Sequence, residues 1–225
     1  MKLSYVIISY NRRERLLQTL SLLPDLTPLP QDAWDVWVVD NASTDGSADA
    51  VAAQFPHVHL IRNPNNEGMA ARNHAFAQLA GEYIITLDDD SYPIDNAVAD
   101  AIDYLDAHPQ TGVLVANVML PDGRHEAPAM PAVMLGGASI IRKAVIDQVG
   151  SFPCEFFRQA EEYDLSMRVW NAGWSIERFE DIVFRHDKHP GGRPGALTAR
   201  MDLRNNLIVA ERYLPRAIRQ VYRRD

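Results

Sequence analysis

The stretch YIITLDDDSYP, from Tyr83 to Pro93, joins a run of apolar residues to three consecutive carboxylates. A short apolar run rich in β-branched and aromatic residues and bounded by turn formers is typical of a buried strand. Similar runs occupy residues 3–9, 35–40, 58–62 and 112–120. Apolar residues at helical spacing lie between them, at 13–23 and 68–79. This alternation predicts an α/β fold with a mainly parallel central sheet and helices on both faces.

The second half of the chain is less regular. Residues 136–150 suggest a strand that enters a helix, 160–173 a helix closed by a glycine, and 174–187 two short strands. Thr198 to Arg219 indicates a long closing helix, interrupted near Pro215. The segment from Asp187 to Gly195 is rich in glycine and proline, which predicts a mobile loop.

Composition narrows the class of protein. A chain of 225 residues suits a single domain, and no apolar run approaches the length of a membrane span. The N-terminus lacks the pattern of a secretory signal, so we expect a cytoplasmic protein. Cys154 is the only cysteine, which excludes an internal disulfide and a thiolate zinc cluster. The net charge of −8 argues against nucleic acid as a partner.

A basic cluster occurs at the C-terminus. It consists of Arg212, Arg216, Arg219, Arg223 and Arg224. One interpretation is a solvated helix face. The other is peripheral association with an anionic membrane, which would place the protein at the inner face of the cell membrane.

Polar residues follow the strands at the points where the apolar runs end. They are Ser9, Tyr10 and Asn11 after the first strand, Asp40 and Asn41 after the second, Asn63 after the third, and the aspartates after the fourth. In parallel α/β sheets, ligands bind beyond the carboxyl ends of the strands. We therefore expect these side chains to meet at one ligand site.

The aspartate triplet has two interpretations. Asp88 and Asp90 project to the same side of an extended chain, so they can converge on one ligand. Adjacent carboxylates repel one another unless a cation or hydrogen-bond donors compensate them, and Mg²⁺ or Mn²⁺ suits such an oxygen site. The alternative is a solvated acidic turn that caps a helix from Asp95 onward.

Asp40 needs an explanation beyond turn chemistry. A turn into a helix is a sufficient explanation for Asp45, Gly46 and Ser47, because Asp45 or Ser47 can cap that helix. It does not account for Asp40. A carboxylate at the end of a strand is well placed to accept hydrogen bonds from a nucleobase N–H or from ribose hydroxyls. Asp40 is therefore a candidate for nucleotide binding.

Six segments, taken together and in order, resemble one protein family. They are VIISYNR, VVDNASTDGS, NEGMAARNHAF, GEYIITLDDDSYP, LGGASIIRKAVIDQVGSF and AEEYDLSMRVWNAGW. The chain resembles the family 2 glycosyltransferases, inverting nucleotide-sugar-dependent enzymes of the GT-A fold, and is especially similar to the rhamnosyltransferase-like branch. The resemblance covers roughly Leu3 to Leu214.

The resemblance implies a fold and a division of labour. The fold is a GT-A type, Rossmann-like three-layer sandwich that forms a single glycosyltransferase domain over residues 1–225. Residues 1–120 would form the half that binds the nucleotide sugar. Residues 121–225 would form the half that binds the acceptor and carries the catalytic base.

The resemblance also implies site residues on the donor side. Those that would bind the nucleotide sugar are Ser9, Tyr10, Asn11, Asp40, Arg72, Asp88 and Asp89, with Arg72 near the phosphates and Asp88 toward the ribose. Asp90, together with Asp88, would hold a divalent metal, Mn²⁺ or Mg²⁺, that bridges the diphosphate. His186 would complete the metal shell, with His189 as a competitor.

The catalytic base is implied by the segment from Glu161 to Leu165. The base position is Glu162, where the family more often has aspartate, and Glu161 and Asp164 are the next candidates. Ser151-Phe152-Pro153-Cys154 replaces a Gly-Phe-Asp-Glu pattern that borders the acceptor. Three further residues, Gly136, Gly137 and Arg193, are assigned to the acceptor side or to a lid over the donor.

These assignments imply partners and leave alternatives. If Asp40 accepts a base N–H, UDP, dTDP and GDP sugars are favoured over CDP sugars. The acceptor would be a carbohydrate or lipid-linked hydroxyl, in polysaccharide, glycolipid or other glycoconjugate synthesis. A catalytically inactive nucleotide-sugar-binding module is one alternative. A sugar nucleotidyltransferase is another, but it would carry a glycine-rich loop after the first strand, and SYNRRERLL contains no glycine.

Overall fold

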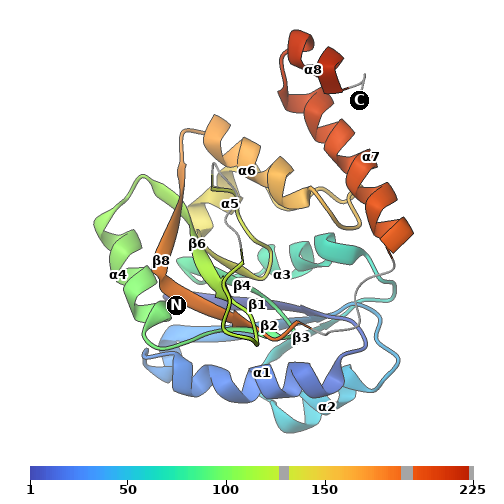
Figure 1. Cartoon of the computed structure of the whole chain (residues 1–225). Helices are drawn as coiled ribbons and strands as arrows, with labels where there is room; N and C mark the ends of the chain where they lie inside the picture. Colours follow the sequence, from blue (N-terminus) through green and yellow to red (C-terminus); the bar gives the residue numbers. More distant parts are fainter. Residues whose placement is uncertain (127–131, 189–194, 223–225) are drawn as a thin grey trace.

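The structure is a computed structural model that describes residues 1–126, 132–188 and 195–222. These residues contain an eight-stranded sheet with the strand order β3-β2-β1-β4-β7-β6-β8-β5 (Figure 1). The strands are β1 (Leu3–Ser9), β2 (Trp34–Asp40), β3 (His59–Arg62), β4 (Tyr83–Asp88), β5 (Ser91–Pro93), β6 (Thr111–Met119), β7 (Ala138–Arg142) and β8 (Ser175–His186).

The sheet is mixed. The neighbours β3, β2, β1 and β4 run parallel, as do β6 and β8, whereas β7 is antiparallel to β4 and to β6, and β5 is antiparallel to β8. Strand β7 follows β6 with no helix among the described residues between them, and it runs antiparallel to β6. The expectation of an α/β fold is confirmed, with an antiparallel insertion in its second half.

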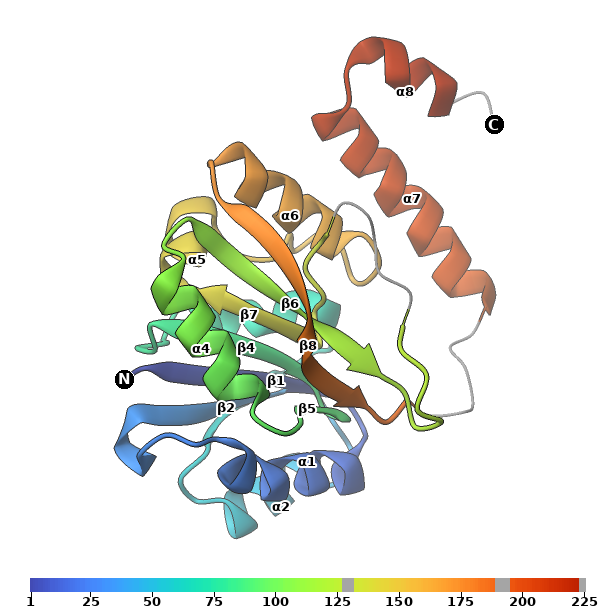
Figure 2. The same ribbon diagram turned by 60° about the vertical axis from the view of Figure 1, so that its left-hand side comes forward.

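Helices cover both faces of the sheet and form a three-layer sandwich (Figures 1 and 2). One face carries α1 (Arg13–Leu26), α2 (Ser47–Gln54) and α4 (Ala97–Ala107). The other face carries η2 (Gly68–Arg72), α3 (Asn73–Phe76), α5 (Lys143–Val149) and α6 (Glu161–Asn171). The short helix η1 (Gln31–Ala33) precedes β2, and α7 (Gly195–Tyr213) and α8 (Arg216–Tyr222) project beyond the sandwich (Figure 2).

The period-two alternation of the strands builds the two cores. In β1, Leu3, Tyr5 and Ile7 pack into the cluster under α1 and α4, whereas Val6 packs into the cluster under α5 and α6. Successive side chains of a strand point to opposite faces, so a strand buried on both faces is apolar throughout. The polar residues at the strand ends, among them Ser9, Asp40 and Asp90, are buried as well, so their polar atoms need partners within the chain or from a ligand.

The predicted helix at 68–79 is wrong in type and extent. The segment forms the 3₁₀ helix η2 and then the short helix α3. Gly68 has a φ of +64°, and a Cβ built there would lie 1.8 Å from the carbonyl oxygen of Phe157. The close approach of this backbone requires glycine at position 68, and the left-handed φ of Gly68 departs from the geometry of a right-handed α-helix.

The second difference concerns residues 174–187, where two short strands were expected. They form the single strand β8, and its pairing with β6 shifts in register after Phe179 and resumes at Val183. An irregularity of this kind bends a strand without ending it. Beyond the irregularity, β8 continues to pair with β6, and its last residues pair with β5 on the opposite edge.

The C-terminal helices agree with the predicted break near Pro215, since α7 ends at Tyr213 and α8 begins at Arg216. The arginine cluster is partly engaged within the chain. Arg212 pairs with Glu155 and, at 2.8 Å, with Asp164, and Arg219 pairs with Glu211 at 3.0 Å. Arg223 and Arg224 lie outside the described residues. Within the described part of the chain, no helix is both long enough and apolar enough to cross a membrane.

Candidate active site

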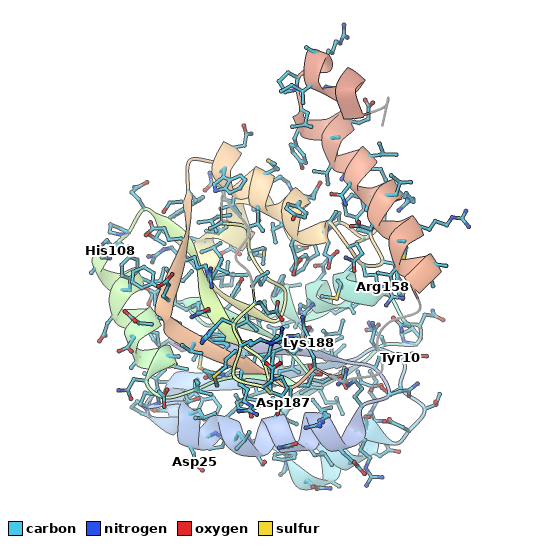
Figure 3. All side chains as sticks on the ribbon, viewed as in Figure 1. Tyr10, Asp25, His108, Arg158, Asp187 and Lys188 are labelled. Carbon is cyan, nitrogen blue, oxygen red and sulfur yellow. The ribbon has the colours of Figure 1, made fainter. Side chains whose placement is uncertain are left out.

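A cleft of about 1020 Å³ lies at the edge where β1, β4 and β8 end. It is lined by residues from the end of β1, the turn between β4 and β5, the loop 135–138, the loop 157–159, the start of α6 and the end of β8. Among the predicted site residues, the lining includes Ser9, Tyr10, Asp88, Asp89, Asp90, Gly136, Gly137, Glu162 and His186. Figure 3 places Tyr10, Arg158 and Lys188 around this region.

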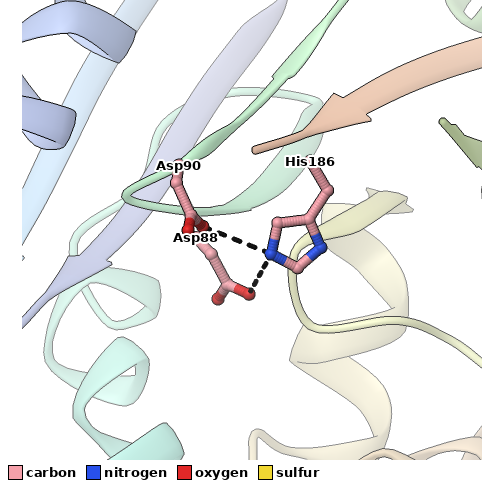
Figure 4. A group of neighbouring side chains, drawn as sticks. All are labelled: Asp88, Asp90 and His186. Atoms are coloured by element: carbon pink, nitrogen blue, oxygen red, sulfur yellow. Dashed lines mark ion pairs between the residues drawn. The ribbon is translucent and has the colours of Figure 1, made fainter. Parts of the chain in front are cut away.

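Three metal-ligand candidates converge on one point of the cleft (Figure 4). Ligand atoms of Asp88, Asp90 and His186 all lie within 4.8 Å of one another. Nε2 of His186 lies 3.2 Å from Oδ1 of Asp90 and 4.0 Å from Oδ2 of Asp88. The β5 to β8 pairing produces this arrangement, because it sets His186 opposite Ser91, the residue after Asp90.

The donor set suits a divalent cation. Carboxylate oxygens are preferred by hard ions, and a neutral imidazole nitrogen completes many transition-metal sites. Burial alone would lower the pKa of His186, but its interactions with Asp90 and Glu126 raise this pKa to about 9. The two aspartates therefore create a region that attracts positive charge.

His189, the competing candidate for the metal shell, lies outside the described residues.

Asp89 lines the cleft but does not belong to the metal-ligand group. Its carboxylate accepts a hydrogen bond from Oγ of Ser9 at 3.0 Å, and Nε of Arg12 lies 3.3 Å from it. Burial raises the pKa of Asp89 to about 7 against the opposing effect of Arg12. Arg12 also pairs with Asp90 at 2.5 Å. Arg12 and His186 thus compensate the triplet that the sequence left without a counter-charge.

Arg72 lies behind Asp88 and is fully buried. Its Nη2 donates to Oδ1 of Asp88 at 2.7 Å and to the carbonyl oxygen of Leu87 at 3.0 Å. The guanidinium fixes one oxygen of Asp88 and leaves Oδ2 on the side of His186. Arg72 is therefore placed to orient Asp88.

The pair Gly136 and Gly137 separates the metal-ligand group from the predicted base. A Cβ at Gly137 would lie 2.7 Å from Oδ2 of Asp88, and a Cβ at Gly136 would lie 3.2 Å from Oε1 of Glu162. The backbone N–H of Gly136 donates to Oε1 of Glu162. A side chain at Gly137 would force Asp88 to move, whereas one at Gly136 would require only a small shift of Met69 or Glu162.

Glu162 is the one of the three base candidates that lines the cleft. Burial and the neighbouring charge of Glu161 raise the pKa of Glu162 well above its usual range, although the N–H of Gly136 opposes this. Glu161 is buried, and Asp164 accepts from Arg168, Arg212 and Tyr213 at 3.0, 2.8 and 2.9 Å. Asp164 thereby ties α6 to α7.

The predicted nucleotide-side residues form a connected edge. Oδ2 of Asp40 accepts from the N–H of Ser43 at 3.2 Å, whereas its buried Oδ1 has no hydrogen-bond partner among the described residues. Oδ1 of Asn11 accepts from the N–H of Thr44 at 2.7 Å and thus joins the loops after β1 and β2. Ser9 and Tyr10 line the cleft beside them.

Several cleft residues were not predicted from the sequence. They are Arg12, Asn66, Glu126, Arg158 and Lys188, whereas Asn41 was among the strand-end residues expected at the ligand site. Nδ2 of Asn41 donates to Oδ1 of Asn66 at 2.9 Å, which holds the loop after β3. The repulsion within the aspartate triplet was a signal for Arg12, but no pattern identified its sequence position. Arg193, assigned to a lid, lies outside the described residues.

The three-layer sandwich with an acidic, metal-competent group at its strand ends is a GT-A type glycosyltransferase fold. The structure of S. aureus TarS residues 1–349 in complex with UDP-GlcNAc matches it with a TM-score of 0.78 and 22% identity, over 99% of this chain and 70% of that one. The mannosyltransferase PcManGT from Pyrobaculum calidifontis, in complex with GDP-Man and Mn²⁺, matches with a TM-score of 0.72 and 18% identity. The match covers 99% of this chain and 68% of that one. The chain spans only 42% of another TarS structure.

Sequence comparison gives the family. The model described as Glycosyl transferase family 2 matches residues 4–161, and the chain belongs to this family of nucleotide-sugar glycosyltransferases. It is 26% identical over 245 residues to the N-acetylglucosaminyl-diphospho-decaprenol L-rhamnosyltransferase of Mycobacterium tuberculosis strain H37Rv, across 86% of this chain and 79% of that protein. It is 28% identical over 202 residues to the poly(ribitol-phosphate) beta-N-acetylglucosaminyltransferase TarS of Staphylococcus aureus strain Mu50. That match covers 82% of this chain and 35% of TarS.

Proposed function

We propose that the cleft transfers a sugar from a nucleoside-diphosphate sugar to an acceptor hydroxyl with inversion at the anomeric carbon, and that Glu162 is the base. The observation that carries this proposal is the position of Glu162 and Asp88 against the glycine pair Gly136 and Gly137. The donor phosphates would therefore bind beside Asp88, and the base Glu162 would act in the adjacent part of the same cleft. The half up to residue 120 would bind the donor, and residues 121–225 would hold the acceptor and the base.

The base step follows from the environment of Glu162. Its carboxylate takes the proton of the acceptor hydroxyl, and the oxygen attacks the anomeric carbon from the face opposite the phosphate. The bond from that carbon to the phosphate oxygen breaks, and the nucleoside diphosphate leaves with the bonding electrons. A carboxyl whose pKa is raised toward neutrality is a stronger base than an ordinary glutamate, and such assistance contributes about 10² to 10⁴ in rate.

The residues Asp88, Asp90 and His186 would hold a divalent cation, which when bound supplies positive charge against the diphosphate leaving group. Mg²⁺ favours oxygen ligands and retained water, so the imidazole of His186 favours Mn²⁺ in this site. The Mn²⁺ in the PcManGT complex supports the same choice. Arg72 holds Asp88 in the orientation that this site needs.

Asp40 is proposed to select the nucleobase. Its buried Oδ1 is an acceptor without a donor in the described chain, and a base N–H would supply one. Uracil, thymine and guanine each offer a ring N–H at the equivalent edge, whereas the ring nitrogen of cytosine at that edge is an acceptor. The UDP-GlcNAc of the TarS structure and the GDP-Man of PcManGT fall within this set.

The acceptor is proposed to be a hydroxyl of a carbohydrate or lipid-linked carbohydrate. The name of the mycobacterial relative, an N-acetylglucosaminyl-diphospho-decaprenol L-rhamnosyltransferase, supports a lipid-linked acceptor. Peripheral association with an anionic membrane through C-terminal arginines would fit such an acceptor. Among the described arginines of that cluster, the exposed Arg216 is the one best placed for it, since Arg212 and Arg219 are paired within the chain.

A thermal-shift panel tests the proposal. UDP, dTDP, GDP and CDP are added separately, each with and without Mn²⁺, because ligand binding to the folded state raises the melting temperature. We expect Mn²⁺-dependent stabilisation by at least one of UDP, dTDP and GDP, and a smaller effect of CDP. A melting temperature that no nucleotide changes would contradict donor binding.

A further inference from the structure

Arg158 lines the cleft from the loop that precedes α6, and the proposed transfer gives it no role. The residue before it, Phe157, is anchored by a hydrogen bond, since its carbonyl oxygen accepts from the N–H of Met69 at 2.9 Å. The residue after it is Gln159. Figure 3 shows Arg158 beside α7 and apart from Asp187 and Lys188, which follow the end of β8. It therefore lies on the wall that carries the base.

Arg158 differs from the other cationic side chains of the cleft in its partners. Arg12 pairs with Asp90 at 2.5 Å, and Lys188 pairs with Glu126 at 2.5 Å. Over residues 1–126, 132–188 and 195–222, Arg158 forms no ion pair with a carboxylate, and its buried Nε has no hydrogen-bond partner. Buried N–H groups are nearly always paired, so this guanidinium has binding capacity that the described chain does not use.

The loop holds Arg158 in a fixed place. Nδ2 of Asn205, a buried residue of α7, donates to the carbonyl oxygens of Arg158 and Gln159, both at 2.8 Å. Gln159 and Ala160 have φ values of 70° and 64°, in the left-handed region that non-glycine residues rarely adopt. The guanidinium carbon lies 5.9 Å from the ring centre of Phe157. A cation held by such a backbone is positioned in advance for a ligand.

We propose that Arg158 binds a phosphate or carboxylate group of the acceptor, so that the enzyme selects acceptors with an anion near the reacting hydroxyl. This inference rests on the proposed function. A guanidinium presents parallel N–H donors that match both oxyanions, and the resulting charge-assisted hydrogen bonds are stronger than neutral ones.

The position of Arg158 favours the acceptor over the donor as the source of the anion. The donor diphosphate is assigned to Asp88, Asp90 and His186, at the turn after β4 and the end of β8. Arg158 comes instead from the segment that leads into Glu162, where the acceptor hydroxyl must lie to lose its proton. Recognition at this wall would place the acceptor before the base takes that proton.

Calorimetry with a matched pair of probes tests the proposal. The intact protein is first titrated with the nucleoside diphosphate that stabilises it most, in the presence of Mn²⁺. The saturated complex is then titrated with glucose 1-phosphate and, separately, with methyl α-glucoside, which lacks the anion. The same titrations are made with Arg158→Gln, Arg158→Lys and the control Arg200→Gln, whose arginine is exposed on α7.

We expect the wild type and Arg200→Gln to bind glucose 1-phosphate more tightly than methyl α-glucoside. In Arg158→Gln this preference should fall by roughly tenfold to a hundredfold, and Arg158→Lys should keep part of it. Nucleoside-diphosphate binding should be unchanged in Arg158→Gln.

Three outcomes overturn the inference. The first is a wild type without preference for the phosphorylated probe, including one that binds neither probe. The second is an Arg158→Gln variant that retains the full preference. The third is a loss of nucleoside-diphosphate binding in Arg158→Gln, which would assign the arginine to the donor. Failure of the proposed function would be seen separately, as absent nucleoside-diphosphate binding in the first titration of the wild type.

Discussion

Nε2 of His186 lies 3.2 Å from Oδ1 of Asp90, although the two residues are far apart in the sequence. Strand pairing brings them together: Ser91 is opposite His186, and the N–H of Asp187 donates to the carbonyl oxygen of Asp90 at 2.8 Å. The metal-ligand group therefore depends on the short pairing of β5 with β8.

Glu162→Gln should retain donor binding and lose transfer. Glutamine keeps the acceptor oxygen that faces the N–H of Gly136, but it cannot take the proton of the acceptor hydroxyl. We expect the turnover number to fall by about 10² to 10⁴, with the nucleoside-diphosphate affinity unchanged. Release of nucleoside diphosphate measures the turnover, and Glu180→Gln, at an exposed carboxylate, is the control. Substantial activity in Glu162→Gln would move the base elsewhere.

The raised pKa of Glu162 predicts a pH dependence. The base works only when ionised, so the turnover number should rise with pH through about 7 instead of between pH 4 and 5. The same shift means that ionisation of Glu162 opposes folding above the unfolded-state pKa. Glu162→Gln should therefore melt at a higher temperature than the wild type at pH 8 and show no such advantage at pH 4. A turnover profile that is flat from pH 5 to 8 would contradict this pKa.

Gly137→Ala should damage the metal site directly. The new Cβ would lie 2.7 Å from Oδ2 of Asp88, so either the backbone or the carboxylate must move. We expect Mn²⁺-dependent nucleotide binding to weaken by about tenfold or more, since one ligand is displaced. Gly195→Ala is the matched control, because a Cβ there meets nothing within 4 Å. Equal Mn²⁺ dependence in the two variants would show that Asp88 does not need this space.

Asn205→Ala, a substitution in α7, should lower both the stability and the turnover number. It removes both hydrogen bonds to the left-handed loop before α6, so we expect a loss of about 2 kcal/mol in the free energy of unfolding, or about 4 to 8 °C in melting temperature. The turnover number should fall more than the Michaelis constant for the donor rises, because Glu162 follows that loop. Asn206→Ala, which loses only bonds to Asp202, is the control. Identical kinetics in both variants would exclude a positioning role.

The sequence predicted the parts of the fold that local pattern determines. The strands of the first half, the helix at α6 and the break near Pro215 are confirmed, because apolar periodicity and proline act over a few residues. The helix at 68–79 was wrong because its geometry depends on a distant contact, between Gly68 and the backbone of Phe157. Tertiary contacts of this kind have no local signal.

The candidate site was predictable to a similar extent. The spacing of Asp88 and Asp90 predicted that the two carboxylates would meet, and they do, but in the turn after β4 and not on an extended chain, since β4 ends at Asp88. The contacts of Arg12 with Asp89 and Asp90, and the orphaned Nε of Arg158, depend on how separate loops meet. The assigned roles of the predicted residues stay predictions that the variants above will test.

The central claim is that Asp88, Asp90 and His186 hold a divalent cation that binds the donor diphosphate. Calorimetric titration of Asp90→Asn with UDP and with GDP, in Mn²⁺ and in its absence, tests this claim most directly. The account predicts that Mn²⁺ strengthens nucleotide binding to the wild type and that Asp90→Asn loses most of this enhancement while its melting transition stays cooperative. Nucleotide binding by folded Asp90→Asn with undiminished Mn²⁺ dependence would contradict it.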